Sequence, residues 1–229
     1  IRDVAPSRGL GDVYKRQSLL ALSAGLLAQS SVKTERQYLS GRGCDDMVQW
    51  DFMCTGGNNS GKWTKIGVPS CWELQGFGTY QYGMKFYGKA FPEGVADEQG
   101  LYKYEFELPA EWNGKQIELV FEGSMTDTQV KINGRKAGSM HQGAFYRFIY
   151  NVSDRVFFGS KKKNVLEVTV SKESANAGVN LAERRADYWN FGGIFRPVFI
   201  VAKPAQNIDR LAIDCLLYTS PSPRDGATS

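Results

Sequence analysis

The sequence predicts an all-β fold, a β-sandwich of the jelly-roll type, and three observations support this. Of the 229 residues, 42% are hydrophobic and 13% aromatic, which is enough for one domain with a core. Glycine is abundant, with 25 residues, and long helix-forming runs of Ala, Glu, Lys and Leu are missing. From Trp50 onward, short runs of alternating apolar and polar residues recur with turn residues between them. Short strands at this spacing, without helical periods between them, indicate a sandwich.

The expected strands follow the alternation along the chain. The first clear run is 101–108, in which Tyr102, Tyr104, Phe106 and Leu108 share one face and Lys and Glu occupy the other. Pro109–Lys115 ends this strand, because it contains a proline and an Asn-Gly pair.

A second alternating run places Ile117, Leu119 and Phe121 on the buried face and Glu118, Val120 and Glu122 on the wet one. Val130–Ile132 then leads into Asn133-Gly134, which predicts a hairpin, since both central residues of a type I′ turn need positive φ.

Two strands are expected nearer the end of the chain. Asn164–Val170 alternates again, and Ile194–Val201 is a further strand. Pro197 predicts an edge position or a bulge there, because proline cannot donate to a ladder. Pro204–Asp214 contains an apolar pattern typical of one more strand, whose partners the chain does not supply.

Both ends of the chain look foreign to the protein. Ile1–Gln17 and Cys215–Ser229 resemble translated sequencing-adapter sequence, and are set aside from the fold prediction; ordinary disordered termini are the alternative. Ser18–Ser31 holds an apolar run too short to span a bilayer, followed by Ala28-Gln29-Ser30, a small-x-small cleavage site. We therefore expect the remnant of a secretory signal at 18–31 and export to a bacterial periplasm or beyond, rather than a buried helix.

Charge and cysteine content exclude some functions. The net charge of +4 is small, and its only cluster is Lys161–Lys163, so nucleic-acid binding is not expected, nor is a transmembrane span. With Cys215 set aside, Cys44, Cys54 and Cys71 are an odd set. One disulfide can form after export, and Cys44–Cys54 is the nearest pair in sequence. No spacing is typical of a metal site, and His141 is the only histidine, so zinc is not expected.

The stretch Asp187–Val198 carries the chemistry that suits a sugar. It combines a carboxylate with Tyr188, Trp189 and Phe191, and aromatic faces stack on sugar rings while carboxylates accept from hydroxyls. Gly192-Gly193 allows a tight turn or a close backbone approach before the strand. The alternative is a loop into a sandwich strand, with Trp189 and Phe191 filling the core or packing between domains.

Several blocks in order resemble the N-terminal sugar-binding domain of glycoside hydrolase family 2, the family of β-galactosidases, β-glucuronidases and β-mannosidases. The resemblance covers about Gln49 to Asp214. The blocks are Val68–Gly76, Gly100–Tyr102, Pro109–Trp112, Phe121–Gly123, Val130–Gly134, His141–Gly143, Asn164–Val168 and Asp187–Val198.

The resemblance implies a domain order as well as a fold. It assigns 32–203 to a jelly-roll sandwich like that of galactose-binding domains, and 204–214 to the start of an immunoglobulin-like domain. The catalytic (β/α)₈ barrel that follows in the family needs about 250 residues, for which this chain has no room.

In the family, the two glutamates of the retaining mechanism sit on the barrel, about 5 Å apart. We therefore expect no catalytic residue in this chain. Glu73, Glu105, Glu107 and Glu122 are interpreted as mostly solvated side chains instead.

The resemblance also points to site residues. Asp187 stands where a loop acid of the family contacts the sugar, directly or through a bound cation, and Trp189 is the weaker second candidate for substrate binding. Trp72 and Tyr80 belong to the other loop that nears the active site. Met84 stands at or near the position where the β-galactosidase pattern offers an amide, which argues against galactose specificity and against a cation site. A monovalent or divalent cation in the whole enzyme stays open.

The remaining polar candidates have weaker implications. His141 is interpreted as a structural histidine, and Arg196 as a bridge to the following domains or a sheet-surface residue.

The expected function is that of a sugar-binding domain from an exported retaining glycosidase that hydrolyses terminal β-linked sugars, a domain inactive by itself. A free-standing carbohydrate-binding module is the alternative, and a structural domain that buttresses the barrel and shapes oligomer contacts is a third.

Overall fold

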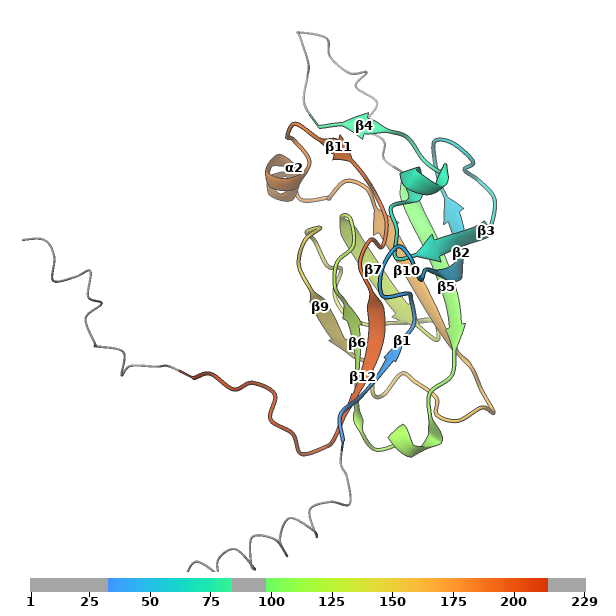
Figure 1. Cartoon of the computed structure of the whole chain (residues 1–229), viewed down its shortest axis with the longest axis vertical. Helices are drawn as coiled ribbons and strands as arrows, with labels where there is room; N and C mark the ends of the chain where they lie inside the picture. The colour runs from blue at the N-terminus through green and yellow to red at the C-terminus, as the bar shows by residue number, and fades with distance from the viewer. Residues whose placement is uncertain (1–32, 84–97, 214–229) are drawn as a thin grey trace, which may run out of the picture.

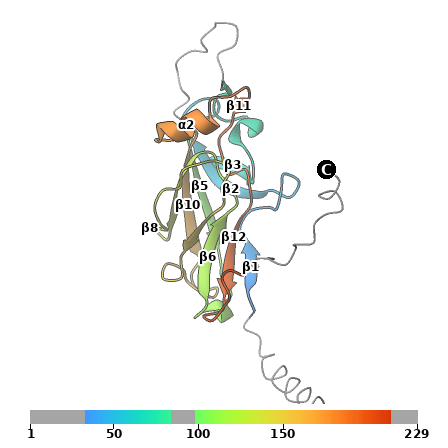
Figure 2. The same cartoon turned by 90° about the vertical axis from the view of Figure 1, so that its left-hand side faces the viewer.

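Two antiparallel sheets pack face to face and enclose the core, as the two views in Figure 1 and Figure 2 show. The structure, a computed structural model, describes residues 33–83 and 98–213. One sheet has four strands and the other six, and a two-stranded ribbon lies at one end of the sandwich. The predicted all-β jelly-roll sandwich is therefore confirmed.

The elements have the following bounds. The four-stranded sheet has the order β1 (Glu35–Tyr38), β12 (Val198–Lys203), β6 (Gln116–Phe121), β9 (Phe148–Asn151). The six-stranded sheet has the order β3 (Thr64–Val68), β2 (Val48–Cys54), β5 (Gln99–Phe106), β10 (Asn164–Ser171), β7 (Asp127–Ile132), β8 (Arg135–Lys136). The ribbon pairs β4 (Gln81–Tyr82) with β11 (Trp189–Asn190). The helical elements are η1 (Trp72–Gln75), η2 (Ala110–Trp112) and α2 (Ala177–Glu183).

The alternating runs form strands as predicted. In β10 every second residue is buried, and the strand pairs with β5 on one side and β7 on the other. Asn133 and Gly134 have φ values of 53° and 79°, so the turn between β7 and β8 has the predicted positive angles. The core between the sheets is built from aromatic and branched side chains, among them Trp50, Phe52, Tyr102, Ile117, Leu119, Phe121, Val130, Leu166 and Ile200.

The outer face of β6 is buried, although the alternation of apolar and polar residues predicts that it is exposed to solvent. Val120 and Glu118 are 3% and 8% exposed. Val120 packs with Phe199 and Val201 of the neighbouring β12 in a small second cluster on the outside of the four-stranded sheet. Tyr38 packs against this cluster, and side chains such as these bury both faces of the strand.

The position predicted from Pro197 is wrong. β12 begins only at Val198 and lies inside the four-stranded sheet, between β1 and β6. Pro197 precedes the strand, and its carbonyl accepts from the Glu122 amide at 3.1 Å. A proline just before a strand needs no ladder donor, so it is compatible with a central position.

Three further regions differ from or add to the expectation. α2 is a short helix that the alternation does not predict; it begins after Asn176, whose side chain accepts from the Gly178 amide at 2.9 Å. Residues 204–213 form no strand in the described part, and Ile208 and Leu211 are 84% and 75% exposed. The segments 1–17, 18–31 and 215–229, and Met84, lie outside the described residues.

The cysteines do not form the considered disulfide. Cys44 is exposed, whereas Cys54 and Cys71 are buried, and all three are free. Cys54 faces the core, and its thiol donates to the Gly56 carbonyl at 3.2 Å. Within the described ranges, no helix has the length and apolar character needed to cross a bilayer.

Candidate functional site

The two loops singled out by the sequence meet in the ribbon at one end of the sandwich (Figure 1). In this ribbon Trp189 is opposite Tyr82 and Asn190 is opposite Gln81. The Gly83 amide adds a bond to the Tyr188 carbonyl at 2.9 Å. Residues 105 positions apart therefore become neighbours, because a backbone ladder holds both loops in one register.

Asp187 and Trp189 lie side by side with tyrosines of the other loop. The Asp187 carboxylate is exposed and accepts from the Tyr82 hydroxyl. The ring centroids of Trp189 and Tyr82 are 5.2 Å apart at 71°, and those of Trp189 and Tyr80 are 6.1 Å apart at 89°. Trp189 is 49% exposed, so it does not fill the core as the alternative had it. Edge-to-face contacts fix the rings and leave apolar surface free at this end.

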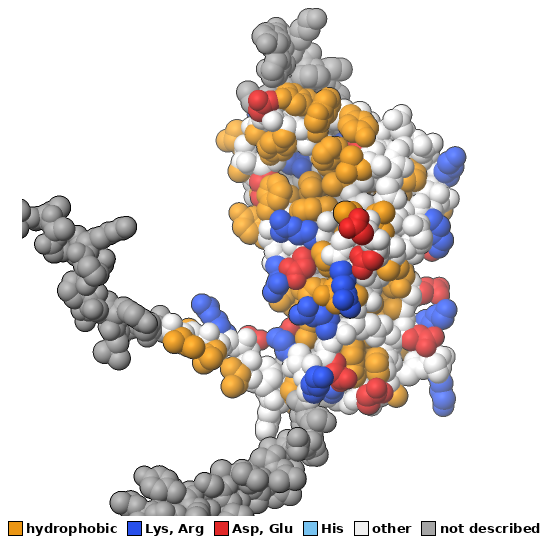
Figure 3. Space-filling model, in the orientation of Figure 1, with side chains coloured by type: hydrophobic (Ala, Val, Ile, Leu, Met, Phe, Trp, Pro, Cys, Tyr) orange, Lys and Arg blue, Asp and Glu red, His pale blue; other side chains and the backbone are white. Residues whose placement is uncertain are grey.

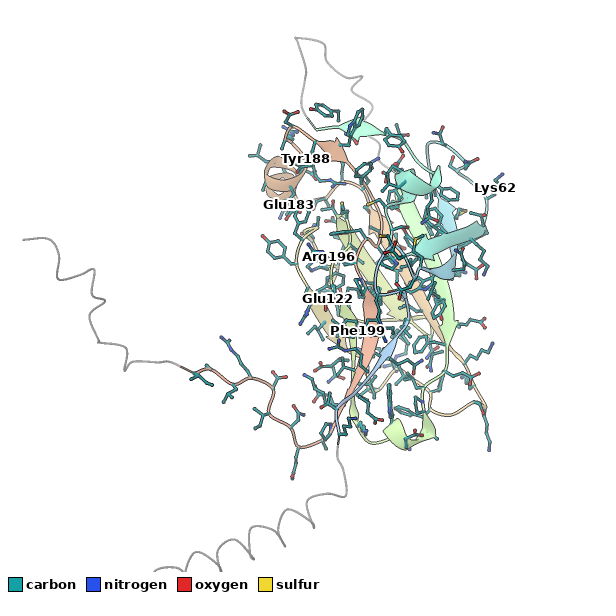
Figure 4. The ribbon with its side chains drawn as sticks, viewed as in Figure 1. Lys62, Glu122, Glu183, Tyr188, Arg196 and Phe199 are labelled. Carbon is teal, nitrogen blue, oxygen red and sulfur yellow. The ribbon has the colours of Figure 1, made fainter. Side chains whose placement is uncertain are left out.

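Figure 3 shows hydrophobic side chains gathered over the end that carries β4, β11 and α2, whereas charged side chains of both signs are interspersed farther along the molecule. Tyr80, Tyr188 and Leu181 are 53%, 38% and 65% exposed there. In Figure 4, Tyr188 and Glu183 lie close together beside α2, and the Tyr188 hydroxyl donates to the Glu183 carbonyl. This end offers aromatic rings and hydrogen-bonding groups on one surface.

Gly192-Gly193 anchors the Asp187 loop to the rest of the domain. A Cβ on Gly192 would lie 2.1 Å from Cζ2 of Trp72, so only glycine fits against that indole. Gly193 has a φ of +127°. The Gly192 carbonyl accepts from the Trp72 amide at 3.0 Å, and the Gly193 carbonyl from the Met125 amide at 2.9 Å. The predicted close backbone approach is confirmed, and the surface approached is Trp72.

A buried cluster of charged side chains lies beneath this loop; we call Glu73, Glu98 and Lys172 the buried triad. The Lys172 Nζ is 2.7 Å from Glu73 Oε1 and 2.9 Å from Glu98 Oε1, and all three side chains are at most 2% exposed. Both Glu73 oxygens also accept from the Gly192 amide, at 3.1 and 3.0 Å. The triad therefore connects η1, the ends of β5 and β10, and the Asp187 loop.

The contacts of Glu98 and Lys172 extend to the other loop. Glu98 Oε1 accepts from the Thr79 amide at 3.0 Å and from the Trp72 indole at 3.2 Å. The Lys172 ammonium donates to the Thr79 carbonyl as well. Since Thr79 leads directly into Tyr80 and β4, the triad holds both strands of the ribbon in place.

Glu73 corrects the sequence interpretation of the glutamates. Glu105 and Glu107 are exposed, as expected, and Glu122 is half-buried against Arg147 with two bonds of 2.8 Å. Glu73 is 1% exposed, and burial raises its pKa above the ordinary value of 4.5, although the Lys172 ammonium opposes this. No alternation marks this position, because Glu73 lies in a 3-10 helix where the apolar neighbour Leu74 points outward at 66% exposure.

Arg184 completes the charge balance under the loop. It is 3% exposed and donates to the Lys172 carbonyl at 2.6 Å and to the Phe191 carbonyl. Its own carbonyl accepts from the Asn190 side chain at 2.7 Å. Arg184 does not pair with Asp187, because its guanidinium bonds to backbone carbonyls inside the domain and the Asp187 carboxylate accepts from Tyr82.

The contacts of His141 and Arg196 are with residues outside the ribbon that carries Asp187. The His141 ring is stacked on Phe148 at 3.9 Å, its Nε2 is 2.9 Å from the Gly143 carbonyl, and burial lowers its pKa from 6.5. Arg196 donates to the carbonyls of Phe145 and Glu122, at 3.1 and 3.4 Å (Figure 4). Both side chains are held by packing and backbone bonds.

The described residues do not fit a cation by themselves. Within 33–83 and 98–213, no group of three His, Cys, Asp or Glu side chains is arranged to hold a metal ion. Asp187 offers one carboxylate, and its neighbours in the ribbon are aromatic and amide side chains. We therefore assign no metal step to these residues.

Comparisons with known proteins agree with this architecture. The model of the family described as "Glycosyl hydrolases family 2, sugar binding domain" matches residues 58–204. A putative β-glucuronidase of Formosa agariphila is 25% identical over 155 residues, which cover 68% of this chain and 17% of that protein. A β-galactosidase of Streptococcus thermophilus is 31% identical over 156 residues, 65% of this chain and 14% of that protein. The chain thus spans about a sixth of the length of these curated relatives.

Solved structures show the same fold. The β-glucuronidase of Bacteroides uniformis superimposes with a TM-score of 0.52 at 23% identity, covering 75% of this chain and 18% of that one. The β-glucuronidase of Bifidobacterium dentium, solved with coumarin-3-O-glucuronide, gives 0.52 at 20% identity, covering 77% and 31%. Fold and family match agree, and the chain belongs to glycoside hydrolase family 2 through its sugar-binding domain.

Proposed function

We propose that this sandwich forms one wall of the substrate pocket of an exported retaining glycosidase that removes terminal β-linked sugars, with Asp187 in direct contact with the sugar. The observation that carries the proposal is the ribbon of β4 and β11, which places the Asp187 carboxylate beside Tyr80, Tyr82 and Trp189 on one exposed end. The barrel that would supply the catalytic glutamates follows in the parent protein, and Pro204 begins the domain between them.

The chemistry at Asp187 suits orientation of a sugar rather than bond cleavage. A carboxylate that accepts from sugar hydroxyls forms charge-assisted hydrogen bonds, and such bonds fix the ring relative to groups on the facing domain. The Tyr82 hydroxyl donates to the same carboxylate and so restricts its rotation before the sugar arrives. Because Asp187 is exposed, its second oxygen is accessible to a ligand.

The substrate is proposed at the level of terminal β-linked sugars. Relatives named β-galactosidase and β-glucuronidase both match the chain at similar identity. Export is proposed from the apolar run before residue 31, which has the length of a secretory signal and no amphipathic spacing.

The test is Asp187→Ala in the full-length parent enzyme, with Asp154→Ala as the control, since Asp154 is an exposed surface aspartate paired to Arg135 and Arg155. We expect Asp187→Ala to lower kcat/KM by about 5- to 150-fold, the equivalent of about 1–3 kcal/mol for a charged hydrogen bond, while the control stays at the wild-type value. An unchanged kcat/KM for Asp187→Ala would overturn the site role and support the buttress function.

The uninterrupted gene separates the glycosidase from the free-standing binding module. A reading frame that continues past Pro204 into a barrel with two glutamates supports the proposal. A stop codon near Pro204 contradicts it and makes the carbohydrate-binding module the function.

A further inference from the structure

A row of charged side chains crosses the outer face of the six-stranded sheet, outside the ribbon that carries Asp187. The strand register places Lys65, Asp51, Lys103, Glu167, Lys131 and Lys136 next to one another in this order. Lys65 and Asp51 pair at 2.7 Å, and Lys103 and Glu167 at 3.7 Å.

The far end of the row carries unbalanced positive charge. Lys131 and Lys136 are directly opposite each other on β7 and β8, and both are exposed. Among the described residues, neither has a carboxylate within ion-pair distance. Like charges directly opposite on a sheet repel, so an anion bound between them would relieve a repulsion already present in the free protein.

A hollow of about 260 Å³ lies on the same face beside Trp63. Trp63 comes immediately before β3 and is 47% exposed, and the Lys103 ammonium is 4.9 Å from its ring centroid. The polar lining of the hollow is Lys103, Gln129, Lys131, Glu167 and Thr169. An exposed indole beside an amide, a hydroxyl and charged groups provides both a stacking face and hydrogen-bond partners.

The dimensions suit a chain of sugar rings. Neighbouring strands are spaced about 4.8 Å apart. Lys131 on β7 therefore lies about 10 Å from the β5 residues that line the hollow together with Trp63, and β8 lies about 14 Å from them. A single ring cannot reach from the indole to both lysines, whereas a short oligosaccharide can.

We propose that this face binds an acidic oligosaccharide, one ring of which stacks on Trp63 while a carboxylate of a following ring lies between Lys131 and Lys136. The proposal goes beyond the pocket wall, because it concerns another face: in Figure 4, Lys62, the neighbour of Trp63, lies on the opposite side of the molecule from Tyr188 and Glu183. Lysine on the edge strand β8 also discourages strand pairing with other chains, but that role explains neither Trp63 nor the hollow.

The test is a titration of the full 229-residue chain with an oligomer of galacturonic acid and with its methyl-esterified, uncharged form. We expect the acidic oligomer to bind more tightly, with an affinity that falls as salt rises, and the ester to bind weakly and without salt dependence. A sulfated oligosaccharide in parallel separates recognition of carboxylate from recognition of negative charge in general; binding as tight as that of the uronate would overturn the carboxylate assignment. Absence of binding to the acidic oligomer would overturn the proposal.

Matched variants locate the site. Trp63→Ala should weaken both oligomers about five- to tenfold, while Phe145→Ala, at the same exposure of 47%, should leave binding unchanged. Lys131→Gln combined with Lys136→Gln should reduce the acidic oligomer to the affinity of its ester, whereas Lys161→Gln in an exposed loop should not. Equal losses in Trp63→Ala and Phe145→Ala, or a double variant that binds like Lys161→Gln, would overturn the proposal.

All of these side chains are exposed, so the thermal midpoint of each variant serves as the check on folding. Asp187→Ala, which tests the pocket wall, should leave this binding unchanged, so the two proposals can fail separately.

Discussion

Lys172, directly after β10, and Lys103, within β5, both pair with glutamates, yet their surroundings are opposite. Lys172 is fully buried and lies 2.7 and 2.9 Å from two buried carboxylates. Lys103 is half-exposed and lies 3.7 Å from Glu167, which is itself about a third exposed. The first pair holds two loops together beneath the Asp187 end, and the second belongs to a row of charges that faces water. The difference shows that burial, rather than residue type, decides whether a charge fixes the fold or shapes a surface.

The physical reason is the cost of removing charge from water. A buried ion without its partner is strongly destabilising, so each member of the buried triad is required once the others are present. Exposed pairs gain little, because water and salt screen them. The comparison therefore predicts large effects under the Asp187 loop and small ones on the outer face.

Lys172→Met is expected to have the largest effect. It removes the only ammonium that, among the described residues, contacts the buried carboxylates of Glu73 and Glu98, and we expect the free energy of unfolding to fall by about 3–5 kcal/mol at neutral pH. Urea denaturation measures this. A loss below about 1 kcal/mol would show that the triad is not needed to hold the two loops.

Gly192→Ala should come next. The new Cβ would lie 2.1 Å from the Trp72 indole, which is completely buried and cannot move aside. We expect a loss of about 1–3 kcal/mol, the usual range for overpacking. Gly43→Ala is the control, because a Cβ there meets no atom within 4 Å. Equal stability of the two variants in the same urea titration would contradict the close contact.

Glu73→Gln tests the buried carboxylate through pH. Burial raises the Glu73 pKa above 4.5, so the folded protein holds this proton more tightly than the unfolded chain does. The Glu73 contribution to stability is therefore greatest below pH 4.5 and declines as pH rises through the raised pKa. Since glutamine does not titrate, the stability of Glu73→Gln relative to the wild type should increase with pH across that interval and then level off. A constant or falling difference in urea titrations at successive pH values would refute it.

Lys103→Met should have the smallest effect. Its ion pair is exposed, so we expect a change of at most about 1 kcal/mol, the upper range for surface pairs. In the same urea titration the loss should be smaller at high salt than at low salt, because salt screens an exposed pair. A loss as large as that of Lys172→Met would remove the distinction between the two lysines.

The fold could be predicted because the strands obey local rules. Asn133-Gly134 needs positive φ at two positions, and the alternation in β5 and β10 marks one buried face without knowledge of the partner strands. The rule failed where both faces are covered, as in β6, where Val120 is buried by residues of β12 that are far away in sequence. The proline rule failed at Pro197, which directly precedes β12. That strand is central because it pairs with both β1 and β6, and the local sequence does not reveal this pairing.

The site could be predicted only in part. The sequence marks Asp187 and Trp189 as a sugar-compatible pair and Gly192-Gly193 as a close approach. In the structure the first two contact tyrosines of the other loop, and the glycines pack against Trp72. The buried triad has no sequence signal, since Glu73, Glu98 and Lys172 come from three separate segments and meet only in the folded state. Trp63 likewise has no sequence signal, because the hollow beside it is formed by residues of several strands that are far apart in sequence.

The pairing of β1 with β12 has a mechanical consequence. In this antiparallel pair Glu35 is opposite Ala202 and Tyr38 is opposite Phe199, so the chain reaches the sandwich at residue 35 and leaves it after residue 203 at the same point. A force that draws these two points apart would act on one hydrogen-bonded pair of the β1–β12 ladder at a time. The ladder would open first at Glu35 and Ala202. Tension between the segments that flank the sandwich would thus peel β1 away while the aromatic end, which Figure 1 shows at the far side, stays intact.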